Sequence, residues 1–367
     1  MIMKYFFTSE AVCEGHPDKV CDKISDYILD EALRQDKYSK MAVEATIKNN
    51  TVVIYGEATT RAKLDYKRLV REVIEDIGYM EEFDVIELVS EQSKEINNAV
   101  CGDEIMAGDQ GIMFGYACKD TEELMPLPIV LANGLCYKLS QIRKSKKVDF
   151  LKSDGKSQVT VEYVDGKPKR VDTIVMAINH AESISQENLR KFAIEEVISK
   201  VISKEYLDEG TKILINQSGS FIIGGPISDS GTTGRKLISD SYGGMARIGG
   251  GAMSSKDPSK VDRSGAYYAR YVAKNVVAND LANICEIQVS YVIGKSNPLS
   301  LFIDTKGTNK VAMDKIYKYV EDNFDFSVQN IIDELDLLRP IYYDVACYGH
   351  FGRKDLDLSW EMIKNIN

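Results

Sequence analysis

One glycine-rich segment has the residues needed to hold a polyphosphate. Nine glycines lie between Gly224 and Gly251, and basic side chains are interleaved with them and follow them. Those bases are Arg235, Lys236, Arg247, Lys256, Lys260 and Arg263. Glycines let backbone amides approach phosphate oxygens, and the bases supply positive charge. The spacing matches neither the P-loop nor the Rossmann fingerprint. A flexible linker would need none of these bases, so we predict a polyphosphate-binding segment.

A second candidate lies at residues 14–19, where the sequence EGHPDK begins a predicted helix with Pro17 in its first turn. The N-terminus of a helix offers unpaired N–H groups to an anion. His16 could donate a hydrogen bond to a phosphate or to a leaving oxygen, and Asp18 could hold a magnesium ion. The alternative for each residue alone is a capping aspartate and a surface histidine.

Carboxylates accompany the glycine-rich segment. Asp229 lies inside it, Asp262 follows it, and Asp109 lies in a tight turn at 108–111. Acids beside a basic cleft suggest magnesium, because a hard cation takes oxygen ligands from carboxylates and phosphates. Each acid alone could equally be a solvated turn residue. Together they predict a magnesium-dependent enzyme that uses a nucleotide, and the absence of GxSxG, HRD and DFG motifs argues against hydrolases and protein kinases.

The elements around these motifs recur in one order. Alternating apolar residues predict strand pairs at 41–48 with 51–57, 158–164 with 170–178, and 285–293 with 299–305. Helical spacing predicts helices before the pairs at 18–35, 129–144 and 264–279, and after them at 64–77, 187–203 and 311–321. Further strands are predicted at 85–89 and 212–216. We therefore predict an α+β fold of three duplicated domains, each built as helix, β-hairpin, helix and strand.

The hairpins start at 41, 157 and 285, and the spacing between these starts is too long for a solenoid repeat and suits duplicated domains. We predict an N-terminal repeat at 1–100, a central repeat at 105–222 and a C-terminal repeat at 224–367. Segments 92–111 and 224–263 have loop composition and are longer than the usual connections in a compact domain. Such long loops indicate a functional site or, for the first segment, a disordered excursion.

Composition sets the remaining expectations. The 367 residues are 44% hydrophobic and carry a net charge of −10, which offers no long-range attraction for nucleic acid or an anionic membrane. No stretch reaches the apolar length of a membrane span, so we expect a cytoplasmic protein. Seven cysteines without a CxxC pair favour reduced, buried thiols over disulfides or a zinc site, and three histidines are too few for a His-rich metal site.

Six ordered strings, spread over nearly the whole chain, closely resemble the S-adenosylmethionine synthetase family. They are TSEAVCEGHPDKVCDKISD from Thr8, AGDQGIMFGYA from Ala107, DGKSQVTVEY from Asp154, GGPISDSGTTGRK from Gly224, YGGMARIGGGAMSSKDPSKVDRS from Tyr242 and YGHFGR from Tyr348. The resemblance implies a three-domain subunit with pseudo-threefold symmetry. It also implies dimers or dimers of dimers with active sites between subunits. The implied reaction joins ATP and L-methionine into S-adenosylmethionine, with release of phosphate and diphosphate from an enzyme-bound tripolyphosphate.

The resemblance also implies residue roles. An ATP site would comprise His16, Asp154, Lys156, Ser220, Phe221, Asp229, Arg235, Lys236, Ala252 and Lys256, with His16, Lys156, Asp109, Arg235 and Lys256 in catalysis. Methionine would contact Glu57, Gln92, Asp229 and Lys260. Asp18 and Asp262 would bind two magnesium ions, Glu44 would bind potassium, and residues 92–104 would form a mobile active-site loop.

Two departures from the family pattern stand out. Ser220 occupies a position where the family commonly has arginine, which removes one expected phosphate or ribose contact, and the segment from Gln92 is shorter and altered. Two other functions stay open from the residues themselves. One is a magnesium-dependent kinase or ligase for a small acid, which would attack phosphorus instead of carbon. The other is a non-catalytic binding subunit that keeps the fold.

Overall fold

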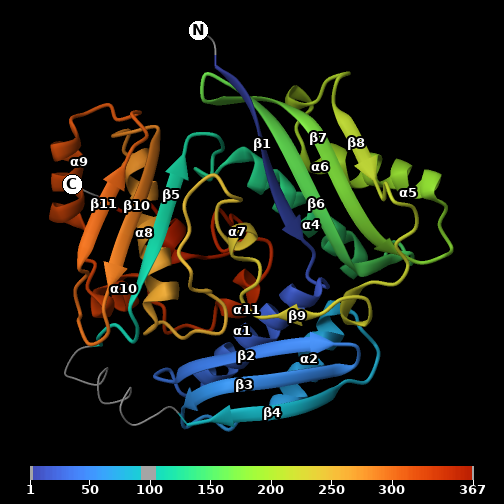
Figure 1. Cartoon of the computed structure of the whole chain (residues 1–367), viewed down its shortest axis with the longest axis horizontal. Coiled ribbons are helices and arrows are strands. Elements are labelled where there is room, and N and C mark those ends of the chain that lie inside the picture. Colours follow the sequence, from blue (N-terminus) through green and yellow to red (C-terminus); the bar gives the residue numbers. More distant parts are fainter. Residues whose placement is uncertain (1–2, 92–104, 366–367) are drawn as a thin grey trace.

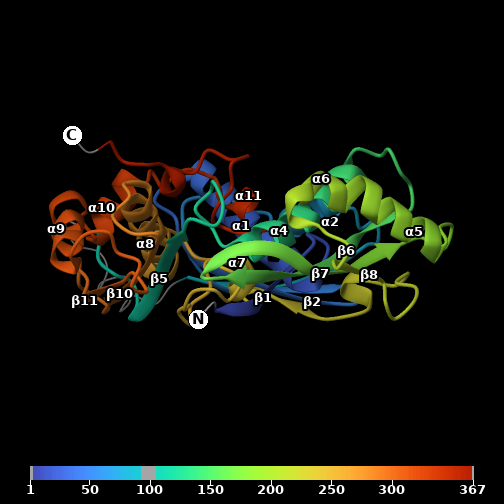
Figure 2. The ribbon, with the colours of Figure 1, turned by 90° about the horizontal axis from the view of Figure 1, so that it is seen from above.

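The computed structural model describes residues 3–91 and 105–365, and it places three β-sheets side by side on one side of the molecule (Figure 1). Helices cover the opposite side of these sheets (Figure 2). The first sheet has the order β4 (Asp84–Ser90), β3 (Thr51–Thr59), β2 (Lys40–Lys48), β9 (Gly231–Thr232). The second is β1 (Lys4–Val12), β6 (Leu151–Val164), β7 (Lys167–His180), β8 (Lys212–Ile215). The third is β11 (Ser300–Asp304), β10 (Ile284–Tyr291), β5 (Gly111–Cys118).

All three predicted hairpins are confirmed, and each gains an antiparallel strand from a distant part of the chain. β9 pairs with β2, β1 pairs with β6, and β5 pairs with β10. None of these three added strands was predicted, because their pairing partners are far away in sequence. Their addition matters for the motifs, since β1 ends just before the EGHPDK sequence and β9 lies just before Arg235.

Six predicted helices are confirmed. Those before the hairpins are α1 (Pro17–Gln35), α4 (Leu127–Lys144) and α8 (Val261–Ala278). Those after them are α2 (Tyr66–Ile77), α9 (Met313–Asn323), and α5 (Gln186–Phe192) continued by a π-helical turn (Ala193–Ile198) and α6 (Ser199–Val201). The shorter helices are α7 (Leu237–Asp240), α10 (Val328–Glu334) and α11 (Tyr342–Val345). The third unit departs from the expected order, because α9 is followed by α10 and the described part of the C-terminal region adds no parallel strand to β11.

Helix α1 lies at the centre of the molecule (Figure 1). Its apolar residues Val20, Ile24 and Ile28 are completely buried, as their spacing predicts. They belong to a core that joins the first and third sheets through α1 and α8. A second core lies between the β6–β7 hairpin and α4. The opposite, polar face of α1 is also buried, which its amphipathic pattern does not predict.

The cysteines agree with the prediction of reduced, buried thiols. Cys13, Cys21, Cys118, Cys136, Cys285 and Cys347 are free and buried, and Cys101 lies outside the described residues. Among the helices in the described ranges, none combines the length and the apolar character needed to cross a membrane.

Candidate active site

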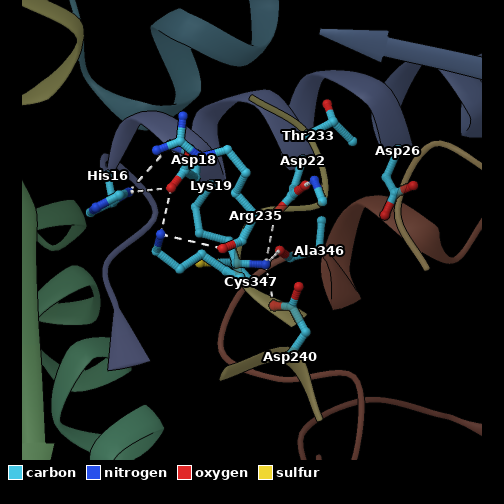
Figure 3. A network of polar contacts seen from close by, with 12 residues as sticks. His16, Asp18, Lys19, Asp22, Asp26, Thr233, Arg235, Asp240, Ala346 and Cys347 are labelled. Atoms are coloured by element: carbon cyan, nitrogen blue, oxygen red, sulfur yellow. Dashed lines mark hydrogen bonds and ion pairs between the residues drawn. The ribbon is translucent and has the colours of Figure 1, made fainter. Parts of the chain in front are cut away.

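His16 occupies the N-cap of α1, where the backbone N–H of Asp18 donates to its Nδ1 at 3.2 Å (Figure 3). The side chain is only 4% exposed. Burial, followed by the charges of Lys236 and Lys156, lowers the pKa of His16 to about 4. His16 is therefore neutral near pH 7. Because Nδ1 accepts a hydrogen bond, its proton lies on Nε2, so the ring can donate from that atom.

Asp18 connects the start of α1 to the glycine-rich segment (Figure 3). Its Oδ1 accepts from the backbone N–H of Thr232 at 3.0 Å, and its Oδ2 pairs with Lys236 Nζ at 2.5 Å. Arg235 Nε lies 3.3 Å from Oδ1. Burial alone would raise the pKa of Asp18, but the hydrogen bonds from Lys236 and Thr232 lower it. The carboxylate is thus ionised and surrounded by cations.

Other predicted residues gather beside this pair. Asp154 is buried and accepts from the backbone N–H groups of Gly155 at 2.7 Å and Gly225 at 2.8 Å. Burial raises the pKa of Asp154, and these two hydrogen bonds oppose that effect. The seven residues of this region form what we call the His16 cluster. Its members are His16, Asp18, Asp154, Lys156, Asp229, Arg235 and Lys236.

Phe221 and Ser220 lie beyond the far end of β7. The carbonyl oxygen of Phe221 accepts from Asn179 Nδ2 at 2.8 Å and from the His180 backbone N–H at 2.9 Å. The Phe221 N–H donates to His180 Nε2 at 3.2 Å. Ser220 is exposed. Phe221 is therefore fixed through its backbone, and the residue is half-buried.

A second group, the Asp262 cluster, comprises Glu57, Asp109, Lys256, Lys260 and Asp262. Lys256 Nζ lies 2.5 Å from Asp262 Oδ2. The backbone of Lys256 forms an isolated antiparallel β-bridge with Ala42 of β2, and Ala42 pairs on its other side with Glu57 of β3. The turn carrying Asp109 also lies here, since a Cβ atom on Gly111 would be 3.3 Å from Asp262 Oδ1.

Asp257 is a residue of this region that sequence reasoning did not single out. It is buried, accepts from the Met41 N–H at 2.7 Å and pairs with Lys260 Nζ at 2.5 Å. Burial alone would raise the pKa of Asp257, but Lys260 lowers it. It anchors the segment 256–260 to β2. The KDPSK string was the only signal of its importance.

The two clusters occupy different positions along β2. Thr232, which Asp18 holds, pairs with Thr46, whereas Lys256 bridges to Ala42. In the described ranges, no group of three or more His, Cys, Asp or Glu side chains is arranged to hold a metal ion by itself. Asp18 contacts Arg235 and Lys236, and Asp262 contacts Lys256.

The remaining predicted residues take separate places. Ala252 lies against Gly234, beside the bases of the His16 cluster, because a Cβ atom on Gly234 would be 2.7 Å from its side chain. Glu44 is half-buried on β2 between Ala42 and Thr46, where its charge, after burial, raises the pKa of Tyr55. Gln92 and the predicted mobile loop at 92–104 lie outside the described residues.

Gly251 provides a test of the Asp262 position. A Cβ atom there would lie 2.0 to 2.2 Å from the Asp262 carboxyl group, whereas one on Gly250 would meet nothing within 4 Å. We expect Gly251→Ala to displace Asp262 and lower kcat/KM by about 10- to 100-fold, since small misplacements have large kinetic effects. Gly250→Ala is the matched control. Steady-state kinetics of both variants measure the effect, and equal activity would mean that Asp262 is not required in its observed place.

The fold and these clusters define a class of protein: a three-sheet α+β chain with a neutral histidine, paired acids and a basic glycine-rich segment suited to a polyanion. Comparisons with known proteins identify one family.

Family models described as S-adenosylmethionine synthetase N-terminal, central and C-terminal domains match residues 4–98, 104–221 and 223–362. An S-adenosylmethionine synthase of Wolinella succinogenes is 50% identical over 98% of this chain and 96% of its own length. One of Finegoldia magna is 47% identical over 97% and 96%.

The chain therefore belongs to the S-adenosylmethionine synthetase family, which confirms the resemblance drawn from its sequence strings. Membership extends over nearly the full chain, so it does not favour the kinase or ligase alternative. The family matches also follow the three-part organisation expected from the recurring hairpins.

Proposed function

We propose that this protein is a cytoplasmic methionine adenosyltransferase, which joins the sulfur of L-methionine to the 5′ carbon of ATP. The observation that carries the proposal is the His16 cluster, in a chain of this family. A neutral, buried imidazole with its proton on Nε2 stands beside Lys236 and Arg235, at the N-terminus of a helix. That arrangement suits a departing polyphosphate. The free, buried thiols suit a reducing compartment.

The residue types fit this reaction because a thioether sulfur has no proton to lose. No general base is needed, and catalysis must come from positioning and electrostatics. Attack on the 5′ carbon breaks its bond to the tripolyphosphate oxygen. We assign His16 Nε2–H as donor to that oxygen, and Lys156, Arg235 and Lys256 as partners of the growing negative charge. A carboxylate, Asp109 or Asp229, would favour the cationic sulfonium product. By family resemblance, one water molecule then hydrolyses a phosphoanhydride bond of the bound tripolyphosphate, which gives phosphate and diphosphate.

The site's acids suit magnesium. Mg²⁺ is commonly held by one or two carboxylates together with substrate phosphates, and Asp18 and Asp262 are single carboxylates that each face basic residues. We propose that each holds one Mg²⁺, which would neutralise phosphate charge when bound. Glu44 has a half-buried carboxylate on the outward face of β2, beside the Tyr55 hydroxyl group, and we propose it for potassium.

Substrate contacts follow from the two clusters. We propose that the His16 cluster, with Ser220, Phe221, Ala252 and Lys256, contacts ATP. Glu57, Asp229 and Lys260, together with Gln92, would contact methionine. The support is proximity: Glu57 lies across β2 from Lys256, and Lys260 lies four residues further along the same loop.

We propose that a second copy of the chain completes each active site, in a dimer or a dimer of dimers. The two clusters lie at separate positions along β2 within one chain, and each substrate is assigned residues from both clusters. One copy would therefore supply the His16 cluster of a site and the other copy its Asp262 cluster. The outward sheet faces support this arrangement, because large apolar side chains are exposed on them. They include Phe6, Ile86, Leu88, Ile112 and Phe302. Each of the three sheets combines a hairpin with an antiparallel strand from a distant part of the chain. This shared pattern also supports pseudo-threefold symmetry, with repeats at 1–100, 105–222 and 224–367.

Charging the outward face should separate the copies. Leu88 is 63% exposed on β4 and pairs with Tyr55, so its side chain shares the outward face with Glu44. We expect Leu88→Arg to shift the protein to monomers and abolish most activity, since an uncompensated buried charge costs about 3–5 kcal/mol. Met362→Arg, at a residue 57% exposed near the C-terminus, is the control. Analytical ultracentrifugation reads out both, and an unchanged oligomer in Leu88→Arg would place the interface elsewhere.

Product analysis tests the function itself. Incubation with ATP, methionine, Mg²⁺ and K⁺ should yield S-adenosylmethionine, phosphate and diphosphate by mass spectrometry and phosphate assay. ADP or AMP without a methionine adduct would indicate a kinase or ligase instead. No turnover of ATP at all would indicate a non-catalytic binding subunit.

A further inference from the structure

Four aspartates follow one face of α1 at intervals of four residues: Asp18, Asp22, Asp26 and Asp30. All four are at most 1% exposed. Such a row on a helix would ordinarily face solvent, because buried charges are expensive without partners. Here each carboxylate instead accepts a backbone N–H from the C-terminal part of the chain. The donors are Thr232 for Asp18, Gly234 for Asp22, Ser255 for Asp26, and Tyr342 with Tyr343 for Asp30.

Asp22 holds the loop that carries two bases of the His16 cluster (Figure 3). Its Oδ1 accepts from the Gly234 N–H at 2.8 Å, and Gly234 directly precedes Arg235 and Lys236. Its other oxygen lies 2.9 Å from Lys19 Nζ. Lys19 also pairs with Asp240 and donates to the Ala346 carbonyl, so Asp22 and Asp240 share one buried cation.

Asp26 holds the segment that carries Lys256 and Asp262. Its Oδ1 accepts from the Ser255 N–H at 2.9 Å and from Arg263 Nη2 at 2.5 Å. Ser255 directly precedes Lys256, and Arg263 directly follows Asp262. Ser255 has a φ of 79°, a conformation that a serine adopts only when its surroundings impose it. Arg263 is fully buried and lies 4.3 Å from the Tyr342 ring centroid.

We infer that Asp22 and Asp26 are positioning residues, Asp22 for Arg235 and Lys236, and Asp26 for Lys256 and Asp262. Arg235, Lys236 and Lys256 lie outside the long helices and strands, and Asp262 lies in the first turn of α8. The buried charge-assisted hydrogen bonds from Asp22 and Asp26 anchor the backbone directly beside these residues. One rigid helix carries both anchors, four residues or about 6 Å apart. The inference rests on the proposed function, because it assigns these bases to that reaction.

Asp30 provides a matched control on the same helix. It is as buried as Asp22 and accepts two backbone N–H groups, at 3.0 and 2.9 Å, but these belong to Tyr342 and Tyr343 at the start of α11. No proposed site residue lies on that helix. Loss of Asp30 should therefore lower stability in the way that loss of Asp22 does, without moving the site's charges.

Kinetics separate positioning from stability. We expect Asp22→Ala and Asp26→Ala to lower kcat by about 100-fold in the folded enzyme, the scale expected for a misplaced catalytic group. Asp22→Asn and Asp26→Asn keep an oxygen acceptor for the same N–H, so they should recover about 10-fold of that loss. Asp30→Ala should lower the melting temperature with kcat within about threefold of the original enzyme. An equal loss of kcat in Asp30→Ala would overturn the inference.

Mixed dimers give a second readout that a general folding defect would not produce. Two differently tagged variants are co-expressed and the hybrid is purified through both tags. Lys236→Ala with Lys256→Ala should regain about half of the original activity, because one of the two sites then receives both intact clusters. Asp22→Ala should be rescued by Lys256→Ala but not by Lys236→Ala. Asp26→Ala should show the reverse pattern.

The outcomes are distinguishable. If the two lysine variants do not complement each other, the shared-site part of the proposed function is wrong, and the kinetic comparison with Asp30 alone decides the inference. If they do complement, but Asp22→Ala is rescued equally by both partners or by neither, Asp22 has no role specific to the His16 cluster and the inference fails. Where an alanine variant does not fold, the asparagine variant is used and should show the same partner preference.

Discussion

Replacing Lys256 by alanine is expected to lower kcat about 100- to 1,000-fold, with much less effect on methionine binding. Lys256 Nζ lies 2.5 Å from Asp262 Oδ2 in the free chain, and both side chains are mostly buried. We propose that the ammonium group stabilises charge that grows on the leaving polyphosphate, so its contribution is larger in the transition state than in the ground state. Removing it also leaves the Asp262 carboxylate without its observed partner.

Single-turnover rates with saturating ATP and methionine measure the expected loss of catalytic rate. Equilibrium binding of methionine tests whether its affinity stays nearly unchanged. Lys318→Ala is the control, because Lys318 is an exposed lysine on α9, a helix that carries no residue of either cluster, and its loss should leave kcat unchanged. A Lys256→Ala enzyme with the original kcat would remove Lys256 from the mechanism.

Replacing His16 is expected to have an effect of similar size, and asparagine is the informative substitution. Asparagine is a favourable N-cap residue, so His16→Asn keeps the hydrogen bond to the Asp18 N–H that begins α1. It lacks a proton donor in the place of Nε2. We expect kcat to fall about 100- to 10,000-fold, the range for losing a positioned proton donor, while the melting temperature stays close to the original. Steady-state kinetics and thermal unfolding together measure both quantities.

The lowered pKa of His16 predicts how kcat and the free energy of unfolding depend on pH. Because its pKa is about 4 in the folded chain, against 6.5 for an unperturbed histidine side chain, His16 stays neutral between pH 5 and 8, and kcat should show no step from it there. The unfolded state binds the proton more tightly. The free energy of unfolding should therefore rise with pH from about 4 to 6.5, with a contribution of at most about 3 kcal/mol from this group. His16→Asn should reduce that slope, and an unchanged slope would contradict the low pKa.

Local features were predictable because they depend on neighbouring residues. The β2–β3 turn at Asn49 and the β6–β7 turn at Asp165 have positive φ values of 51° and 50°, which asparagine and aspartate tolerate better than most residues. Pro17 in the first turn and the apolar spacing along α1 likewise predicted where that helix begins and which residues face the core. The glycine-rich segment was predicted to be largely irregular, and it contains only short elements such as β9 and α7.

The row of aspartates on α1 shows the limit of such reasoning. Spacing alone places Asp22, Asp26 and Asp30 on one face, and a charged face would normally be assigned to solvent. Their burial depends on backbone N–H groups more than 200 residues away, which no local pattern reports. The same applies to β1, β5 and β9, whose partners β6, β10 and β2 lie far away in the sequence.

The sequence by itself determined the chemistry available to this protein: a histidine at a helix start, basic residues among glycines, acids for a hard cation, and strings that identify the family. Only the tertiary structure decided how these groups are divided. It placed the His16 cluster and the Asp262 cluster at different positions along β2, and it made α1 the common support of both. The physical reason is that hydrogen bonds between distant segments form only after the chain has lost its conformational entropy, so their partners depend on the whole fold.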